Sequence, residues 1–553
     1  MIYINQLRQK LNVVVLAICG CFAAFFFMPM VASAHAYVVQ SSPAVSQSLS
    51  KAPSVVEVQF DENVQLVPGG LTVTDVDNHR VDLQDAKLDP KNHREIEVHV
   101  PANLSKGLYT IHWQVISADG HMVQGTIPFG IGIDVSSLQK GATETGYIPG
   151  AAMILDRTAQ YLGISIIIGL SVFLRFLWPT SKEETRRLSA SQKWVLGFGW
   201  AILTVGMALS LPLQTAISWS VHGLASFSPT YMLRTLNFTL FGYLWIIQML
   251  LLLIVPAVIA ILLNPHVRHR WWWSLSPIFL LPITMGLIGH AVAEDNPTLP
   301  VIAVVVHIYA ASVWVGGIVG SILLVHSWLR DKASVEQKDI LHAIGRFSLV
   351  AIISIALLGL SGFYGALIHI PTWYALFHTG YGQTLLVKLA LFFLMLLFAL
   401  IHRLRRARVT SSLRTFMVME FIASVAIFVA TSLLTNLPTG QNNPGPIHKT
   451  QVVSGDKISF SVTPNHVGEN QFTVSIVDNE GKPLTNAQQV TLAFGSASIP
   501  QGAETLRLSQ TQPGVYAGKG LSLSGGGRWT VTVDVLTNTF TDIKTTFPIT
   551  VGQ

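Results

Sequence analysis

Residues 299–328 read LPVIAVVVHIYAASVWVGGIVGSILLVHSW, a stretch without a single aspartate, glutamate, lysine or arginine. A helix of about 20 apolar residues crosses the hydrocarbon core of a bilayer, so this stretch predicts a membrane-spanning helix. The whole chain of 553 residues is 50% hydrophobic and only 12% charged, which is typical of a membrane protein. Eight stretches of this kind predict an eight-helix transmembrane bundle, near residues 152–178, 194–218, 238–263, 272–292, 299–328, 346–369, 382–402 and 415–436.

The loops between these spans alternate in charge. Lysine and arginine are concentrated after the first, third, fifth and seventh spans, and are almost absent from the other loops. Because basic loops stay on the cytoplasmic side, this alternation predicts that both ends of the chain lie outside the membrane. The net charge of +6 therefore reflects topology in a bacterial plasma membrane, and we expect no nucleic-acid partner.

The first 34 residues have the pattern of a secretory signal peptide. A short positive region precedes an apolar run, and Ala32-Ser33-Ala34 supplies the small residues of a cleavage site. Cleavage there removes both cysteines of the chain, so disulfides and cysteine metal sites are not expected. It also makes His35 the first residue. A terminal histidine offers its α-amino nitrogen and one imidazole nitrogen to the same metal, an arrangement that suits Cu(II).

A second pair of donors follows at Asp119 and His121. Residues two apart on an extended strand point to the same face, so this carboxylate and imidazole can converge on one ion. Together with His35 they predict a metal site of three nitrogens and one oxygen.

The surrounding sequence resembles the periplasmic copper-binding family CopC from His35 to about residue 132. The resemblance implies a β-sandwich in which His35, Asp119 and His121 hold Cu(II), and we predict this domain at residues 35–135. Alternating segments such as 55–60, 70–74 and 109–113 agree with short strands. The matching segments are His35-Ala36-Tyr37, Ser42-Pro43-Ala44, Ala52-Pro53, residues 56–60, Gly107-Leu108-Tyr109 and Ser117-Ala118-Asp119-Gly120-His121, with Gly125 and Phe129.

Strand patterns return after the last predicted span. Segments 472–477, 490–494 and 529–533 predict a second, immunoglobulin-like β-sandwich at residues 451–553, which resembles the YtkA-like domains. Residues 136–150 and 437–450 are predicted to be linkers on either side of the membrane domain at 151–436.

Ionisable residues inside a membrane are costly, so they are candidate functional groups. We single out His290 at the outer end of the fourth span, His307 inside the fifth and Lys388 in the outer part of the seventh as a transport path. Imidazoles together with methionines such as Met285 can pass a copper ion.

The membrane part also resembles the copper-resistance family CopD. The order CopC-like, CopD-like and YtkA-like in one chain resembles the YcnJ-like family of bacterial copper-uptake proteins. The matching segments are residues 307–317, Arg346-Phe347-Ser348 with Gly359 and Gly362, and residues 381–388.

The predicted function is copper transport rather than enzymatic catalysis, with inward direction implied by the resemblance. The expected partners are copper ions, the lipid bilayer and an extracytoplasmic copper chaperone. Neither a phosphate-binding loop nor the phosphorylation motif of metal-pumping ATPases occurs. Two alternatives stay open: a membrane oxidoreductase that uses haem or copper, and a copper resistance or storage factor.

Overall fold

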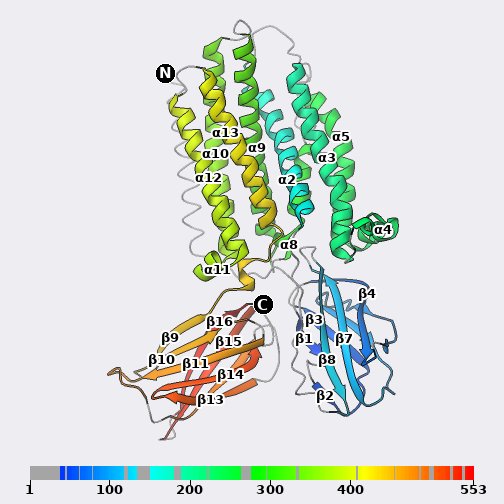
Figure 1. Cartoon of the computed structure of the whole chain (residues 1–553), viewed down its shortest axis with the longest axis vertical. Coiled ribbons are helices and arrows are strands. Elements are labelled where there is room, and N and C mark those ends of the chain that lie inside the picture. The colour runs from blue at the N-terminus through cyan, green and yellow to red at the C-terminus, as the bar shows by residue number, and fades with distance from the viewer. Residues whose placement is uncertain are drawn as a thin grey trace.

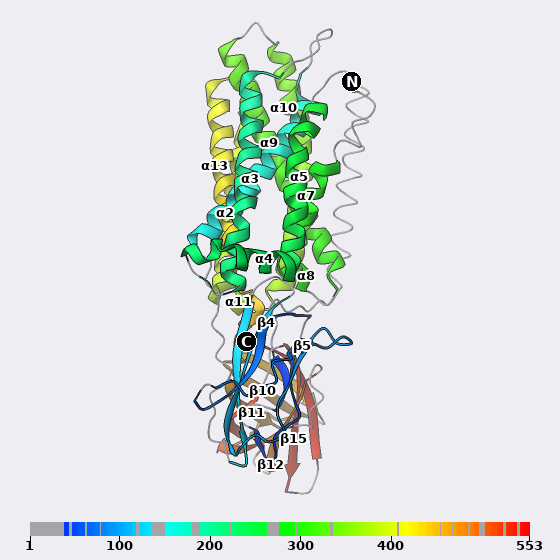
Figure 2. The same ribbon diagram turned by 90° about the vertical axis from the view of Figure 1, so that its right-hand side faces the viewer.

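The protein consists of a helical bundle with two β-domains at one of its ends (Figure 1). A view turned by 90° shows the same order, with α4, α8 and α11 nearest the β-domains (Figure 2). The computed structural model describes residues 38–43, 47–60, 63–77, 79–117, 122–133, 150–179, 188–219, 221, 223–262, 276–293, 296–331, 336–405, 409–453, 455–466, 468–484, 487–496, 504–523, 527–538 and 542–552. The predicted signal peptide lies outside these residues.

The N-terminal domain is a sandwich of two four-stranded sheets, with strand orders β1-β3-β6-β5 and β2-β8-β7-β4. Alternation builds its core: in β3, Val56, Val58 and Phe60 are buried, and Phe60 meets the Trp113 ring edge-on at 5.3 Å. This confirms the predicted sandwich. Its strands are β1 Val38–Ser42, β2 Gln47–Leu49, β3 Val55–Phe60, β4 Gln65–Asp75, β5 Lys87–Leu88, β6 Glu95–His99, β7 Gly107–Ile116 and β8 Met122–Ile131.

Seven helices in the described part of the chain are long and apolar enough to cross a membrane. They coincide with seven of the eight predicted spans. The first is continued by two π-helical segments, η1 Ile166–Leu170 and η2 Phe173–Leu177. The first span begins with α2 Ala151–Ser165. The other six are α3 Ala190–Ser218, α5 Leu240–Leu262, α9 Thr298–Arg330, α10 Gln337–His369, α12 Gly380–Arg405 and α13 Ser411–Leu434. Shorter elements are η3 Gly223–Phe227, α4 Pro229–Phe238, α11 Trp373–His378 and η4 Gly440–Asn442.

The predicted fourth span, near 272–292, differs from the expectation of one long helix. Its described part forms α7 Ser276–Gly286 and the short α8 His290–Ala293. Gly289 lies between them with φ of +115°, a backbone conformation that residues with a Cβ rarely adopt. The helix is interrupted there because this φ is not helical. The count of eight helices is therefore approximate.

Helix α9 lies at the centre of the bundle and packs against α2 with η1, α7, α10 and α13. Glycine makes its closest approach possible. A Cβ on Gly316 of α9 would lie 2.3 Å from the Ser165 carbonyl oxygen, and one on Gly169 would lie 2.1 Å from the Ser312 oxygen. Small residues of this kind let membrane helices pack backbone against backbone.

The C-terminal domain is a β-domain of eight strands in the order β16-β15-β12-β13-β14-β11-β10-β9. Strand β13 pairs with both β12 and β14, so the sheet folds over a core that contains Phe460, Phe472 and Phe547. The strands are β9 Ile447–Val453, β10 Asp456–Thr463, β11 Gly468–Val477, β12 Ala487–Ser496, β13 Glu504–Gln512, β14 Val515–Leu523, β15 Gly527–Thr537 and β16 Asp542–Val551.

Candidate functional site

The three predicted copper ligands, His35, Asp119 and His121, lie outside the described residues. Their nearest described neighbours are Val38 at the start of β1, Ser117, which follows Ile116 at the end of β7, and Met122 at the start of β8. The strand register relates these neighbours. Ile116 pairs with Met122 and also with Gln65, the first residue of β4. Val38 pairs with Phe60, five residues before Gln65. All of them therefore belong to one end of the sandwich.

This end of the sandwich faces the membrane domain. The side-chain oxygen Oε1 of Gln65 accepts a hydrogen bond of 3.3 Å from the backbone N–H of Leu240, the first residue of α5. Strand β2, which pairs with the last residues of β8, lies at the far end (Figure 1). The end of β7 and the start of β8, between which two predicted ligands lie in the sequence, are consequently on the side of the bundle.

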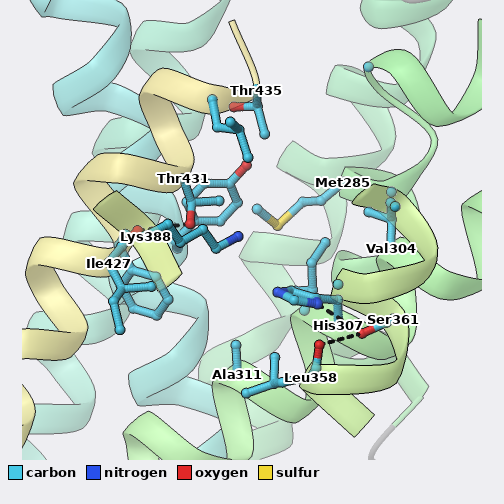
Figure 3. Close-up of a pocket in the computed structure, with 18 of the residues that line it drawn as sticks. Met285, Val304, His307, Ala311, Leu358, Ser361, Lys388, Ile427, Thr431 and Thr435 are labelled. Carbon is cyan, nitrogen blue, oxygen red and sulfur yellow. Dashed lines mark hydrogen bonds between the residues drawn. The ribbon is translucent and has the colours of Figure 1, made fainter. Parts of the chain in front are cut away.

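A cavity of about 770 Å³ lies inside the membrane domain, lined by residues of α2, α3, α5, α7, α8, α9, α10, α12 and α13. Most of its wall is apolar, and two of the three predicted path residues, His307 and Lys388, line it. Figure 3 shows these two side chains on opposite walls, both pointing into the same space. The third, His290, begins α8, and its side chain is outside the described part of the structure.

His307 is held by a neighbouring helix. Its Nδ1 lies 2.8 Å from Oγ of Ser361 on α10, and the Ser361 hydroxyl donates to the Leu357 carbonyl at 2.6 Å. A hydroxyl has one proton to donate, and when Ser361 donates it to Leu357 its Oγ accepts the Nδ1 proton of His307. This assigns the tautomer in which Nε2 keeps its lone pair. Nε2 is then able to bind a metal ion.

Lys388 lies opposite His307 at a similar depth. His307 is nine residues from the start of α9, and Lys388 is eight residues from the start of α12, which corresponds to about 12–14 Å along each helix. Within the described part of the chain, the Lys388 ammonium has no hydrogen-bond or ion-pair partner. The sulfur of Met285, near the end of α7, also points into the cavity (Figure 3).

Asp156 is a functional candidate that sequence reasoning missed. This α2 residue lines the cavity and is only 6% exposed. Its Oδ2 accepts a hydrogen bond of 2.7 Å from Gln160, whereas its buried Oδ1 has no hydrogen-bond partner among the described residues. The available signal was a carboxylate within the first predicted span, a position where an ionisable residue is costly.

A cluster of Asp75, Asp77 and His79 in the N-terminal domain also has the residue types of a metal site. Asp75 Oδ1 already accepts the backbone N–H groups of Asp77 and His79 at 3.0 and 2.9 Å, as in an ordinary polar turn. These bonds lower the pKa of Asp75, which is opposed by burial. The cluster is explained by turn geometry alone.

Comparison with protein families divides the chain into the same parts. Residues 38–132 match the CopC domain, residues 148–299 the copper resistance protein D-like N-terminal domain, and residues 341–434 copper resistance protein D. Residues 450–544, for which the sequence suggested a YtkA-like domain, match the family FixH. The fold and these matches define a multi-pass membrane protein that joins a CopC domain to a CopD domain.

A relative that matches almost the whole chain identifies the family within this class of membrane proteins. The chain is 32% identical to the copper transport protein CutJ of Bacillus subtilis over 532 residues, which cover 94% of this chain and 96% of that protein. It therefore belongs to the CutJ family of copper transport proteins, as the fused domains led us to expect.

Partial relatives match the N-terminal domain. Protein YobA of Escherichia coli is 29% identical over 98 residues, 18% of this chain and 79% of YobA. Copper resistance protein C of Xanthomonas campestris is 30% identical over 105 residues, 18% of this chain and 82% of that protein. The crystal structure of CopC from Methylosinus trichosporium is 27% identical and covers 18% of this chain and 93% of that structure, with a TM-score of 0.16.

Proposed function

We propose that this protein transports copper into the cell. The N-terminal domain captures Cu(II) at His35, Asp119 and His121 outside the membrane, and the membrane domain accepts copper in the cavity that contains His307. Its role is translocation rather than catalysis. An extracytoplasmic copper chaperone is the proposed source of the ion.

The observation that carries this proposal is the direction in which the N-terminal sandwich points. The strand ends that flank the predicted ligands face the bundle, and Gln65 contacts Leu240 there. A metal released from that end starts next to the membrane domain and needs no long diffusion. In the cavity, the lone pair on Nε2 of His307 supplies the first acceptor, since imidazole is a good copper ligand.

Inward direction is supported by the predicted topology, which places the capturing domain outside the cell. Both β-domains lie at the same end of the bundle, as the predicted outside location of both ends requires (Figure 2).

The test is the copper content of cells grown in scarce copper. Cells that contain the intact gene are compared with a deletion strain and with strains that carry His35→Ala or His93→Ala. His93 is an exposed histidine of the same domain and serves as the matched control. We expect less copper in the deletion and His35→Ala strains and unchanged copper with His93→Ala. Equal or higher copper after deletion would refute uptake and favour efflux, storage or redox chemistry.

A further inference from the structure

We propose that copper occupies the membrane cavity as Cu(I), bound by Nε2 of His307 and the sulfur of Met285, while Lys388 disfavours Cu(II). This assignment rests on the proposed transport function and adds to it the oxidation state of the ion that crosses. It differs from the N-terminal site, whose predicted nitrogen and oxygen donors suit Cu(II). Transfer between the two sites therefore includes a one-electron reduction of each ion, for which we assign a small thiol outside the membrane as reductant: two Cu(II) and two thiols give two Cu(I), one disulfide and two protons.

The donor atoms in the cavity, a thioether sulfur and an imidazole nitrogen, favour Cu(I). A thioether is a soft ligand that selects Cu(I), whereas imidazole binds copper in either state. Helices α7 and α9 pack against each other, so Met285 and His307 belong to the same wall of the cavity. Figure 3 shows the sulfur of Met285 and the imidazole of His307 directed into the same space.

Met285 differs from the other methionines that line the cavity. Met153 and Met395 are only 5% and 2% exposed, so their side chains are packed into the helix interfaces. Met285 is half-buried and projects into open volume. Among the described residues, it is therefore the methionine best placed to reach a cavity ion.

The charged residues that line the cavity also favour Cu(I) over Cu(II). Arg157 and Lys388 are its cationic lining residues in the described part of the chain, against one acidic residue, Asp156. Asp156 and Arg157 are adjacent on α2 and have opposite charges, so they offset each other and Lys388 is the remaining cation. The repulsion energy between Lys388 and a metal ion is proportional to the charge of the ion at any given distance. Lys388 therefore repels Cu(II) twice as strongly as Cu(I). The low dielectric of the membrane interior strengthens this difference.

The first experiment measures the copper ligands in the full-length protein, purified in lipid nanodiscs under anaerobic conditions and loaded with Cu(I). X-ray absorption at the copper edge reports whether sulfur is bound. Met285→Leu removes the sulfur and nearly conserves side-chain volume. Met207→Leu makes the same change at a fully buried methionine of α3 in the same apolar core, away from the cavity, and is the control.

We expect a copper–sulfur signal in the wild-type protein and in Met207→Leu, and its loss in Met285→Leu. The same variant should weaken Cu(I) binding, measured by competition with a chromogenic chelator, by about tenfold or more. Cu(II) binding by the N-terminal domain, followed by electron paramagnetic resonance, should not change. A sulfur signal that survives Met285→Leu would overturn the assignment of this ligand.

The second experiment tests charge selection with Ag(I), a soft monovalent ion that needs no reductant. Proteoliposomes that contain the wild-type protein should accumulate Ag(I) and exclude Zn(II), and Lys388→Gln should reduce this discrimination. Exclusion of Ag(I) by a protein that still moves copper would overturn the Cu(I) assignment and leave the transport function intact. Failure to move copper in either oxidation state would instead refute the proposed function.

Discussion

Ser361→Ala isolates the contribution of one hydrogen bond to the cavity site. The substitution removes the Oγ that lies 2.8 Å from Nδ1 of His307 and also the bond from Ser361 to Leu357. The imidazole is then no longer held in the tautomer that leaves Nε2 free. The helix itself should persist, because alanine has the highest helix propensity.

The size of the effect follows from the kind of bond that is lost. A neutral hydrogen bond contributes about 0.5–1.5 kcal/mol, and the loss of a group that orients a metal-binding histidine costs about 10–100-fold in affinity. Because Ser361 is a neutral partner, we expect the lower end of this range. Ser361→Ala should weaken copper binding in the cavity by about tenfold, which corresponds to about 1.4 kcal/mol.

The assay is Cu(I) competition on full-length protein, with two comparison variants. Ser348→Ala removes a serine of the same helix whose hydroxyl donates to the Ile344 carbonyl, so the copper affinity of this variant should equal that of the wild type. Ser361→Thr keeps a hydroxyl and should recover most of the affinity. If Ser361→Ala binds copper as tightly as Ser348→Ala does, then Ser361 does not orient His307 for binding.

Three further predictions concern other parts of the chain. Gly316→Ala should destabilise the bundle by about 1–3 kcal/mol, because its Cβ would lie 2.3 Å from a backbone oxygen. Fluorescence-detected gel filtration should then show a smaller folded fraction. Gly197→Ala is the control and should leave this fraction unchanged, because open space surrounds Gly197. Asp156→Asn should lower copper transport in proteoliposomes while binding by the N-terminal domain stays normal; unchanged transport would show that the carboxylate is dispensable. Burial opposes ionisation of Asp82, but Arg80 and two backbone N–H groups bring its pKa below 3.8. The resulting stability should be present above about pH 4 and lost as the pH falls further, and Asp82→Asn should flatten this acid dependence in pulse proteolysis.

The sequence was sufficient for those features that depend on short, local stretches. Hydropathy over about 20 residues located seven helices that the structure confirms, because the cost of placing polar groups in a bilayer acts on each span separately. Alternation within five or six residues located strands such as β3, since side chains of a strand take opposite faces. The same local reasoning selected His307 and Lys388 as costly intramembrane groups.

Local reasoning was weaker where the backbone conformation of single residues mattered. The fourth span is apolar throughout, so its composition predicted one helix, yet the positive φ of Gly289 separates α7 from α8. Asp156 escaped attention for a related reason. Near the end of a span, a carboxylate can be solvated, and only its position in the bundle shows that it is buried.

The composition of the cavity was decided by tertiary structure alone. Four different helices contribute His307, Ser361, Met285 and Lys388 to the cavity. The mean hydropathy of each span does not predict which helix faces pack against each other. Lipid and apolar side chains are similar solvents for a helix face, so packing depends on shape, such as the contact between Gly169 and Gly316. The sequence by itself therefore predicted the spans, the N-terminal sandwich, the β-rich C-terminal domain and the candidate ligands. Only the folded bundle decided that an imidazole, a thioether and an ammonium group share one cavity, because those contacts join residues far apart in the chain.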